Sequence, residues 1–226
     1  MKIFEVTLTV LNLNAAVAFY RDTLEMPVDQ TNRQAVVQVG SSQLTLIEGD
    51  QFDGAHHVAF GIPPSDFEVA RDWLASRVET IVVDGSDVID GPEGWESESL
   101  YFLGPEDIIV ELIARQADSK EIGGGGQRPR LLSISEIGVA SPEVASTVKE
   151  LTGNLGLSTF PPQGAQFAAV GDHDGLLIVV DQERIWFPTQ SLRPSRGPLK
   201  IRLEAPREAS HLSLTESITI TSSSMR

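Results

Sequence analysis

The sequence predicts an α+β fold of repeated βαβββ modules, each made of a strand, a helix and three further strands. Two observations support this prediction. Three times along the 226 residues, a strand-like segment is followed by a capped amphipathic helix and then by short alternating segments. A run of four glycines at 123–126 separates the second of these units from the third. We expect the first two modules to form one cleft-bearing domain and the third module to follow it.

The first module is expected to place a helix from Asn12 to about residue 25, after its first strand. Asn12 is a favourable N-cap residue because its side chain can accept a hydrogen bond from the first helical turn. Val17, Tyr20 and Leu24 recur at spacings of three and four, which places them on one face of this helix. The expected strands of the module are 4–10, 35–39 and 43–48.

The second module repeats this order with a helix from Ser65 to about residue 77. Phe67, Ala70 and Leu74 form its apolar stripe. The expected strands of the second module are 57–62, 79–83, 98–103 and 107–114.

The third module begins its helix at Ser141-Pro142, a cap followed by a proline in the first turn. The inner stripe of this helix is expected to be Val144, Val148 and Leu151. The expected strands of the third module are 133–140, 166–170, 176–180 and 199–204.

The domain boundaries follow from the glycine run and from a change of composition near the end. We expect a cleft-bearing domain at 1–116, a glycine-rich flexible linker at 117–130 and the third module at 131–206. Residues 207–226 are rich in Ser and Thr, but their apolar residues alternate. This segment is therefore either a loose tail or an edge strand.

Composition excludes several classes of partner and site. The formal net charge is −15, and such a surface repels a phosphate backbone, so we expect no nucleic acid partner. No apolar run reaches the roughly 18 residues that cross a bilayer, and the N-terminal residues do not form a signal peptide. We therefore expect a cytoplasmic protein without a membrane partner. The chain has no cysteine, so nitrogen and oxygen atoms must bind any metal.

Three segments resemble a known superfamily. Phe-Glu-Val-Thr-Leu-Thr-Val-Leu-Asn-Leu at 4–13, with Phe-Tyr-Arg-Asp-Thr-Leu at 19–24, is similar to the opening strand and helix of the vicinal-oxygen-chelate superfamily. This superfamily includes glyoxalases, bleomycin-resistance proteins and extradiol dioxygenases. His-Val-Ala-Phe-Gly-Ile at 57–62 resembles the start of its second module, and residues 99–112 resemble its closing hairpin. The third module resembles the superfamily more weakly, through Glu-Ile-Gly-Val at 136–139.

The resemblance implies a divalent metal ion, Mn, Ni, Fe or Zn, bound by Glu5, His57 and Glu111. Strand alternation agrees, because Glu5 shares a face with Thr7, and His57 lies on the face opposite the apolar side chains of its strand. Glu5 departs from the family, which usually has His there and Gln in some members. The same alternation directs His56 away from the cleft. The candidates for a fourth ligand are Gln43, Thr45 and Glu48.

The resemblance also implies catalytic residues in the cleft. Tyr101 and Thr7 match a substrate-contacting Tyr and a cleft Thr of the similar fosfomycin-resistance thiol transferases. The implied activity is that of a lyase or oxidoreductase acting on a small oxygenated substrate that chelates the metal. One alternative is a metal-free protein that sequesters a small ligand, as bleomycin-resistance relatives do. Another is a degenerate module whose role is assembly.

The third module has no partner within the expected two-module domain. It either pairs with the same module of a second chain, which would make a homodimer, or packs against the first domain through the tail strand. His173 lies in Asp-His-Asp-Gly at 172–175, which is typical of a hairpin turn. The segment 184–189 contains a Trp-Phe pair beside a proline and is expected to be a loop anchored by its aromatic rings.

Overall fold

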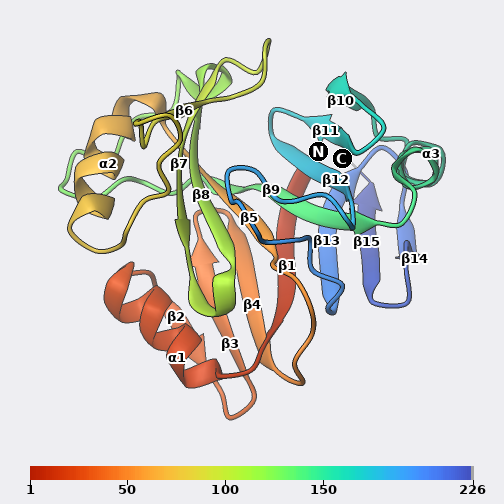
Figure 1. The fold of residues 1–226 in the computed structure, drawn as a ribbon, viewed down its shortest axis with the longest axis horizontal. Helices are drawn as coiled ribbons and strands as arrows, with labels where there is room; N and C mark the ends of the chain where they lie inside the picture. The colour runs from red at the N-terminus through yellow and green to blue at the C-terminus, as the bar shows by residue number, and fades with distance from the viewer. Residues whose placement is uncertain (225–226) are drawn as a thin grey trace.

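The computed structural model describes residues 1–224, and its strands join into one continuous fifteen-stranded sheet with helices packed against it. Figure 1 shows α1 and α2 at one end of the molecule and α3 at the other, with β1 and β9 between them. This confirms the predicted α+β class. None of the helices in the described part is long and apolar enough to cross a membrane.

The first module has the strand order β1-β4-β3-β2, with β1 parallel to β4. Its elements are β1 (Lys2–Val10), α1 (Leu13–Ala18), β2 (Val28–Gln30), β3 (Gln34–Val39) and β4 (Ser42–Glu48). Asn12 caps α1 as predicted, because its side chain accepts a 3.0 Å hydrogen bond from the backbone N–H of Ala15. A π-helical turn (Phe19–Thr23) continues α1 and buries Tyr20.

The second module has the equivalent order β5-β8-β7-β6, with β5 parallel to β8. Its elements are β5 (His57–Ile62), α2 (Phe67–Ala75), β6 (Ile89–Asp90), β7 (Ser97–Leu103) and β8 (Ile109–Arg115). The predicted strand at 79–83 is wrong. Thr80 forms an isolated bridge to Phe102, and β6 occupies the edge of the module instead.

The third module has the order β9-β12-β11-β10, with β9 parallel to β12. Its elements are β9 (Ser133–Ser141), α3 (Val144–Leu155), β10 (Thr159–Gln163), β11 (Phe167–Asp172) and β12 (Gly175–Asp181). The helix cap lies two residues later than predicted. The Glu143 carboxylate accepts from the N–H groups of Ala145 and Ser146, whereas the Ser141 hydroxyl accepts from the N–H of Glu143.

The remaining strands form a unit that we call the fourth module. It consists of β13 (Leu199–Ala205), β14 (Ala209–Ser213) and β15 (Ile218–Ser224). Its order is β13-β15-β14, with β13 parallel to β15, so it repeats three of the four strands of a module's sheet and lacks the helix and the edge strand in the described residues. The assignment of 199–204 to the third module was therefore wrong, because β12 already occupies the parallel position beside β9. The alternating tail forms strands and buries Ile218 and Ile220.

The modules pair in an order that differs from the prediction. β1 is antiparallel to β13, and β5 is antiparallel to β9, so the first module pairs with the fourth and the second with the third. A cleft between the first and second modules was predicted, but those modules do not share a strand pair in the described structure. The third module finds its partner within the same chain, and its first strand is therefore not free to pair with a second copy.

The glycine-rich segment between the second and third modules is held against the second module. The Asp66 carboxylate accepts hydrogen bonds of 2.9 and 2.8 Å from the backbone N–H groups of Gly124 and Arg130. A Cβ atom on Gly123 would lie 1.9 Å from an Asp66 oxygen, so this glycine allows a close approach of the two segments.

Candidate metal centre

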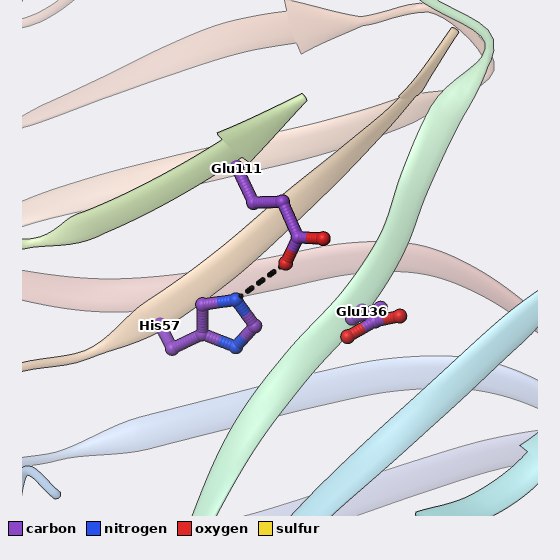
Figure 2. Close-up of side chains that lie close together, drawn as sticks. All are labelled: His57, Glu111 and Glu136. Atoms are coloured by element: carbon purple, nitrogen blue, oxygen red, sulfur yellow. Dashed lines mark hydrogen bonds and ion pairs between the residues drawn. The ribbon is translucent and has the colours of Figure 1, made fainter. Parts of the chain in front are cut away.

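Three buried side chains meet where the second and third modules join. His57 comes from β5, Glu111 from β8 and Glu136 from β9, and one ligand atom of each lies within 4.8 Å of the other two. Figure 2 shows the His57 ring and the Glu111 carboxylate pointing toward one another, with Glu136 on the adjacent strand. We call these three residues the His/Glu cluster.

The register of the strands brings the cluster together. In the antiparallel pair of β5 and β9, Ala59 lies opposite Glu136, so that Glu136 and His57 lie on neighbouring strands of the same sheet. In the parallel pair of β5 and β8, His57 lies opposite Ile109, and Glu111 follows two residues later on the same face. The cluster therefore depends on a contact between modules that are separated by the glycine run.

The strand register identifies equivalent positions in all four modules. At the position of His57, the first strands of the four modules carry Glu5, His57, Glu136 and Lys200. The residues two positions beyond their parallel partners, on the last strands, are Thr45, Glu111, Ile178 and Thr221. At these four positions the second and third modules carry three side chains that could bind a metal and one apolar residue, Ile178. At the equivalent four positions the first and fourth modules carry a single carboxylate, Glu5.

Hydrogen bonds hold the cluster in place. His57 Nε2 lies 2.9 Å from Glu111 Oε2, and the Ser99 hydroxyl donates a 2.6 Å hydrogen bond to Glu111 Oε1. Arg115, which is fully buried, forms an ion pair with Glu136 Oε1. His57 Nδ1 is also buried, and it has no hydrogen-bond partner in the described part of the chain.

The two carboxylates of the cluster have opposite pKa shifts. Burial raises the pKa of Glu136 to about 7; the charge of Glu111 adds to this, and Arg115 opposes it. Burial also acts to raise the pKa of Glu111, but hydrogen bonding to His57 and the positive charges nearby outweigh it, so that this pKa is lowered. A second negative charge in the cluster is therefore unfavourable unless a cation compensates it.

These observations fit a divalent cation. The donors are one imidazole and two carboxylates, the ligand atoms are already close together, and the carboxylate repulsion calls for a further positive charge. Arg115 is the opposing feature, because its guanidinium already compensates part of the charge of Glu136.

Of the predicted site residues, the structure brings His57, Glu111 and Tyr101 together. Tyr101 lies opposite Glu111 in the β7–β8 pair, and its ring centroid is 6.4 Å from that of His57. Burial raises the pKa of the Tyr101 hydroxyl well above its usual range, and the charge of Glu111 adds to this.

Glu5 and Thr7 lie in the other pair of modules, because β1 pairs with β13 instead of β5. Glu5 accepts a 2.9 Å hydrogen bond from the Thr45 hydroxyl and lies 3.3 Å from Arg202 Nε. Thr7 is opposite Lys200. The candidate fourth ligands Gln43, Thr45 and Glu48 belong to β4 in the same sheet.

Sequence reasoning missed Glu136 as a cluster member, although a signal was present. Glu-Ile-Gly-Val at 136–139 aligns with His-Val-Ala-Phe at 57–60, so Glu136 occupies the ligand position of the third module in the sequence pattern, but the pattern did not place that position beside His57. The role of Arg115 could not be predicted, because its partner Glu136 is 21 residues away and in another module.

A cavity of about 520 Å³ opens beside the cluster and includes His57, Tyr101 and Glu136 in its lining. Trp186 closes one side of it. The centroid of its ring lies 5.2 Å from that of His57, and its indole N–H donates a 3.0 Å hydrogen bond to the Ala55 carbonyl. Gly138 makes room for this ring, because a Cβ atom there would lie 2.6 Å from a Trp186 ring carbon.

The segment 184–189 is therefore a wall of the cavity, which the sequence did not indicate. His56 points away from the cluster, as strand alternation predicts. Its Nε2 lies 3.3 Å from the Ser195 hydroxyl, and burial lowers the His56 pKa to about 4. His56 thus helps to hold the chain segment that follows the Trp186 wall.

Comparison with known proteins finds similarity at the level of structure. No protein-family model matches the sequence, and no curated protein matches it. A solved structure described as a "putative dioxygenase" from Bacillus subtilis is 12% identical, with a TM-score of 0.62 over 99% of this chain and 85% of that chain. Glyoxalase I from Zea mays is 14% identical, with a TM-score of 0.55 over 89% of this chain and 74% of that chain. At such identities the likeness establishes the fold.

Proposed function

From the vicinal-oxygen-chelate fold that this chain shares with glyoxalase and dioxygenase structures, we propose that it is a metal-dependent enzyme acting on a small oxygenated substrate. The observation that supports this proposal most is the His/Glu cluster, in which three buried ligand atoms lie within 4.8 Å of one another at a cavity. His57, Glu111 and Glu136 would hold the ion, which we expect to be Mn, Ni, Fe or Zn.

When bound, the ion would supply Lewis-acid stabilisation of negative charge on substrate oxygens. The protein contributes the remaining parts of the chemistry. Arg115 holds Glu136 Oε1, and Glu136 Oε2 has no hydrogen bond among the described residues. Burial raises the pKa of Glu136 to about 7 in the absence of an ion, and a bound cation would oppose this effect and hold the carboxylate in its charged, ligating form. Trp186 covers His57 and limits the access of water.

A second candidate function, metal-free sequestration of a small ligand, is favoured by two observations. Arg115 already neutralises Glu136, and Ile178 takes the place that a fourth ligand would occupy. The cluster would then be a buried ion network, and the cavity would hold its ligand without chemistry.

Metal analysis distinguishes the two functions. The protein should be purified without chelators or metal affinity resin and then analysed by plasma mass spectrometry. We expect about one ion per chain in the wild type. His57→Ala should lose this ion, and Glu136→Gln should lose most of it. Glu5→Gln is the matched control, because Glu5 occupies the equivalent position in the other pair of modules, and it should retain the metal.

Circular dichroism should confirm that each variant is folded. If the wild type contains no metal and takes up none after reconstitution with each of the four ions, the enzyme proposal is wrong and ligand sequestration is supported.

A further inference from the structure

The cavity beside the His/Glu cluster has walls suited to a flat apolar molecule. Five aromatic side chains line it: Trp95, Tyr101, Phe167, Trp186 and Phe187. Ile178 adds an aliphatic surface at the position equivalent to Glu111. A volume of about 520 Å³ lies within the range of pockets that enclose whole small molecules, so the cavity exceeds the need of a two- or three-carbon substrate.

One cation lines this cavity without a carboxylate partner. Arg184 is half-buried, its guanidinium carbon lies 5.2 Å from the centre of the Phe167 ring, and it makes no ion pair among the described residues. Burial lowers the pKa of Arg184, which reflects the loss of water around its charge. The adjacent Glu183 pairs instead with Arg193 and Arg196.

A shortage of carboxylates does not explain the missing ion pair of Arg184. The sequence has 32 acidic and 17 basic residues, so carboxylates are abundant. Apart from Arg184 and the His/Glu cluster, the charged residue that lines the cavity is Asp90. Asp90 is exposed to solvent, so its charge is screened. A partly desolvated guanidinium beside aromatic rings is a site for a planar anion, which it can bind through two parallel hydrogen bonds.

We propose that the substrate or ligand of this cavity is an aromatic acid, whose ring packs between the aromatic walls and whose anionic group binds Arg184. This inference rests on the proposed function in taking the cavity as the ligand site. It does not require a metal, because neither Arg184 nor the aromatic wall residues belong to the three residues of the His/Glu cluster.

Calorimetric titration of the full-length protein with 2-naphthoate tests the proposal. We expect one molecule to bind per chain, and the neutral isostere 2-naphthamide to bind about tenfold more weakly or worse, since a charged hydrogen-bond pair is lost. Octanoate has the anion without the ring, and it should also bind more weakly. Quenching of fluorescence from Trp95 and Trp186 provides a second readout inside the cavity.

Substitutions assign the anion site. Arg184→Gln should weaken 2-naphthoate binding about tenfold and leave 2-naphthamide binding unchanged. Arg193→Gln is the matched control, because Arg193 follows on the same segment but pairs with Glu183, and it should bind 2-naphthoate like the wild type. Asp90→Asn should bind 2-naphthoate as tightly as the wild type or more tightly.

The proposal is overturned if 2-naphthoate fails to bind at millimolar concentration, if 2-naphthamide binds equally well, or if Arg184→Gln has no effect. The outcome is independent of the metal analysis. Titration of His57→Ala shows this directly, because a variant that has lost the ion but still binds 2-naphthoate in an Arg184-dependent way would keep the aromatic-acid site. The enzyme proposal is rejected separately, by the absence of metal from the wild type.

Discussion

At the scale of single residues, the affinity of the candidate metal site for an ion depends on one apolar side chain. Ile178 occupies, in the third module, the position that Glu111 occupies in the second, and it is buried at the wall of the cavity. The site therefore has three of the four ligands that two equivalent modules would supply. This arrangement leaves coordination positions open for a substrate, at the expense of affinity for the ion.

We predict that Ile178→Glu increases the affinity for a divalent metal by about tenfold or more, because affinity rises with the number and charge of the oxygen ligands. In the metal-free state the same substitution should lower stability, since a buried carboxylate beside Glu111 and Glu136 is unfavourable. Metal titration followed by competition with a chromogenic chelator measures the affinity.

The neutral control for this prediction is Ile178→Gln, which has nearly the same size as the Glu variant but no charge. Equal metal affinity in the Glu variant and the wild type would mean that Ile178 does not occupy a ligand position.

At the scale of the elements, the loop between β12 and β13 connects the cavity to the rest of the molecule. Its residues pair with the loop that precedes β5, where Ala55 donates to the Arg193 carbonyl and accepts from the Ser195 N–H. Trp186 projects from the same loop onto His57. The two loops that connect the module pairs therefore also form one side of the candidate site.

Gly138→Ala should disrupt this arrangement. The added Cβ would lie 2.6 Å from the Trp186 ring and 3.3 Å from the Cβ of His57, so the ring must move away from Gly138. We expect a loss of about 1–3 kcal/mol in the free energy of unfolding, as for other overpacked sites, and weaker binding of cavity ligands. Urea unfolding followed by circular dichroism measures the loss.

Gly153→Ala is the matched control for this prediction. Gly153 lies in α3 with no atom within 4 Å of an added Cβ, so alanine should be neutral or stabilising by up to about 1 kcal/mol. If Gly138→Ala unfolds with the same free energy as the wild type, the loop that carries Trp186 can move to accept the methyl group without loss of stability.

Most elements of the first three modules could be predicted from sequence because alternation and capping are local. The strands at 4–10, 35–39, 43–48 and 57–62 and the helix cap at Asn12 lie close to where the pattern placed them. The strand at 79–83 was wrong because its residues form two isolated bridges, Thr80 to Phe102 and Val83 to Ser86, which local alternation does not distinguish from a ladder. The fourth module was missed because it lacks the helix that identified the other three.

At the scale of the whole molecule, the pairing of modules could not be predicted from the sequence. Each first strand offers one edge to its own last strand and the other to a different module, so several pairings satisfy the same local pattern. The choice of β1 with β13 and of β5 with β9 decides that Glu136, and not Glu5, joins His57. The predicted pairing therefore placed Glu5 in the same cleft as His57, whereas the structure places Glu136 beside His57.

This pairing predicts that residues 1–122 will not fold alone as a stable monomer. Such a fragment retains the first and second modules but loses β13 from the edge of β1 and β9 from the edge of β5, which leaves both inner edges and their apolar faces uncovered. We expect it to aggregate or to unfold without a cooperative transition. Co-expression with residues 127–226 should restore a one-to-one complex.

The control is the full chain with a protease site in the glycine run at 123–126, cleaved after folding. It should stay associated on size-exclusion chromatography and keep its thermal transition, because strand pairing and not the linker joins the halves. A monomeric fragment 1–122 that unfolds as cooperatively as the full chain would contradict the prediction. The first two modules would then form an independent domain, and the ligand set Glu5, His57 and Glu111 would be open again in that fragment.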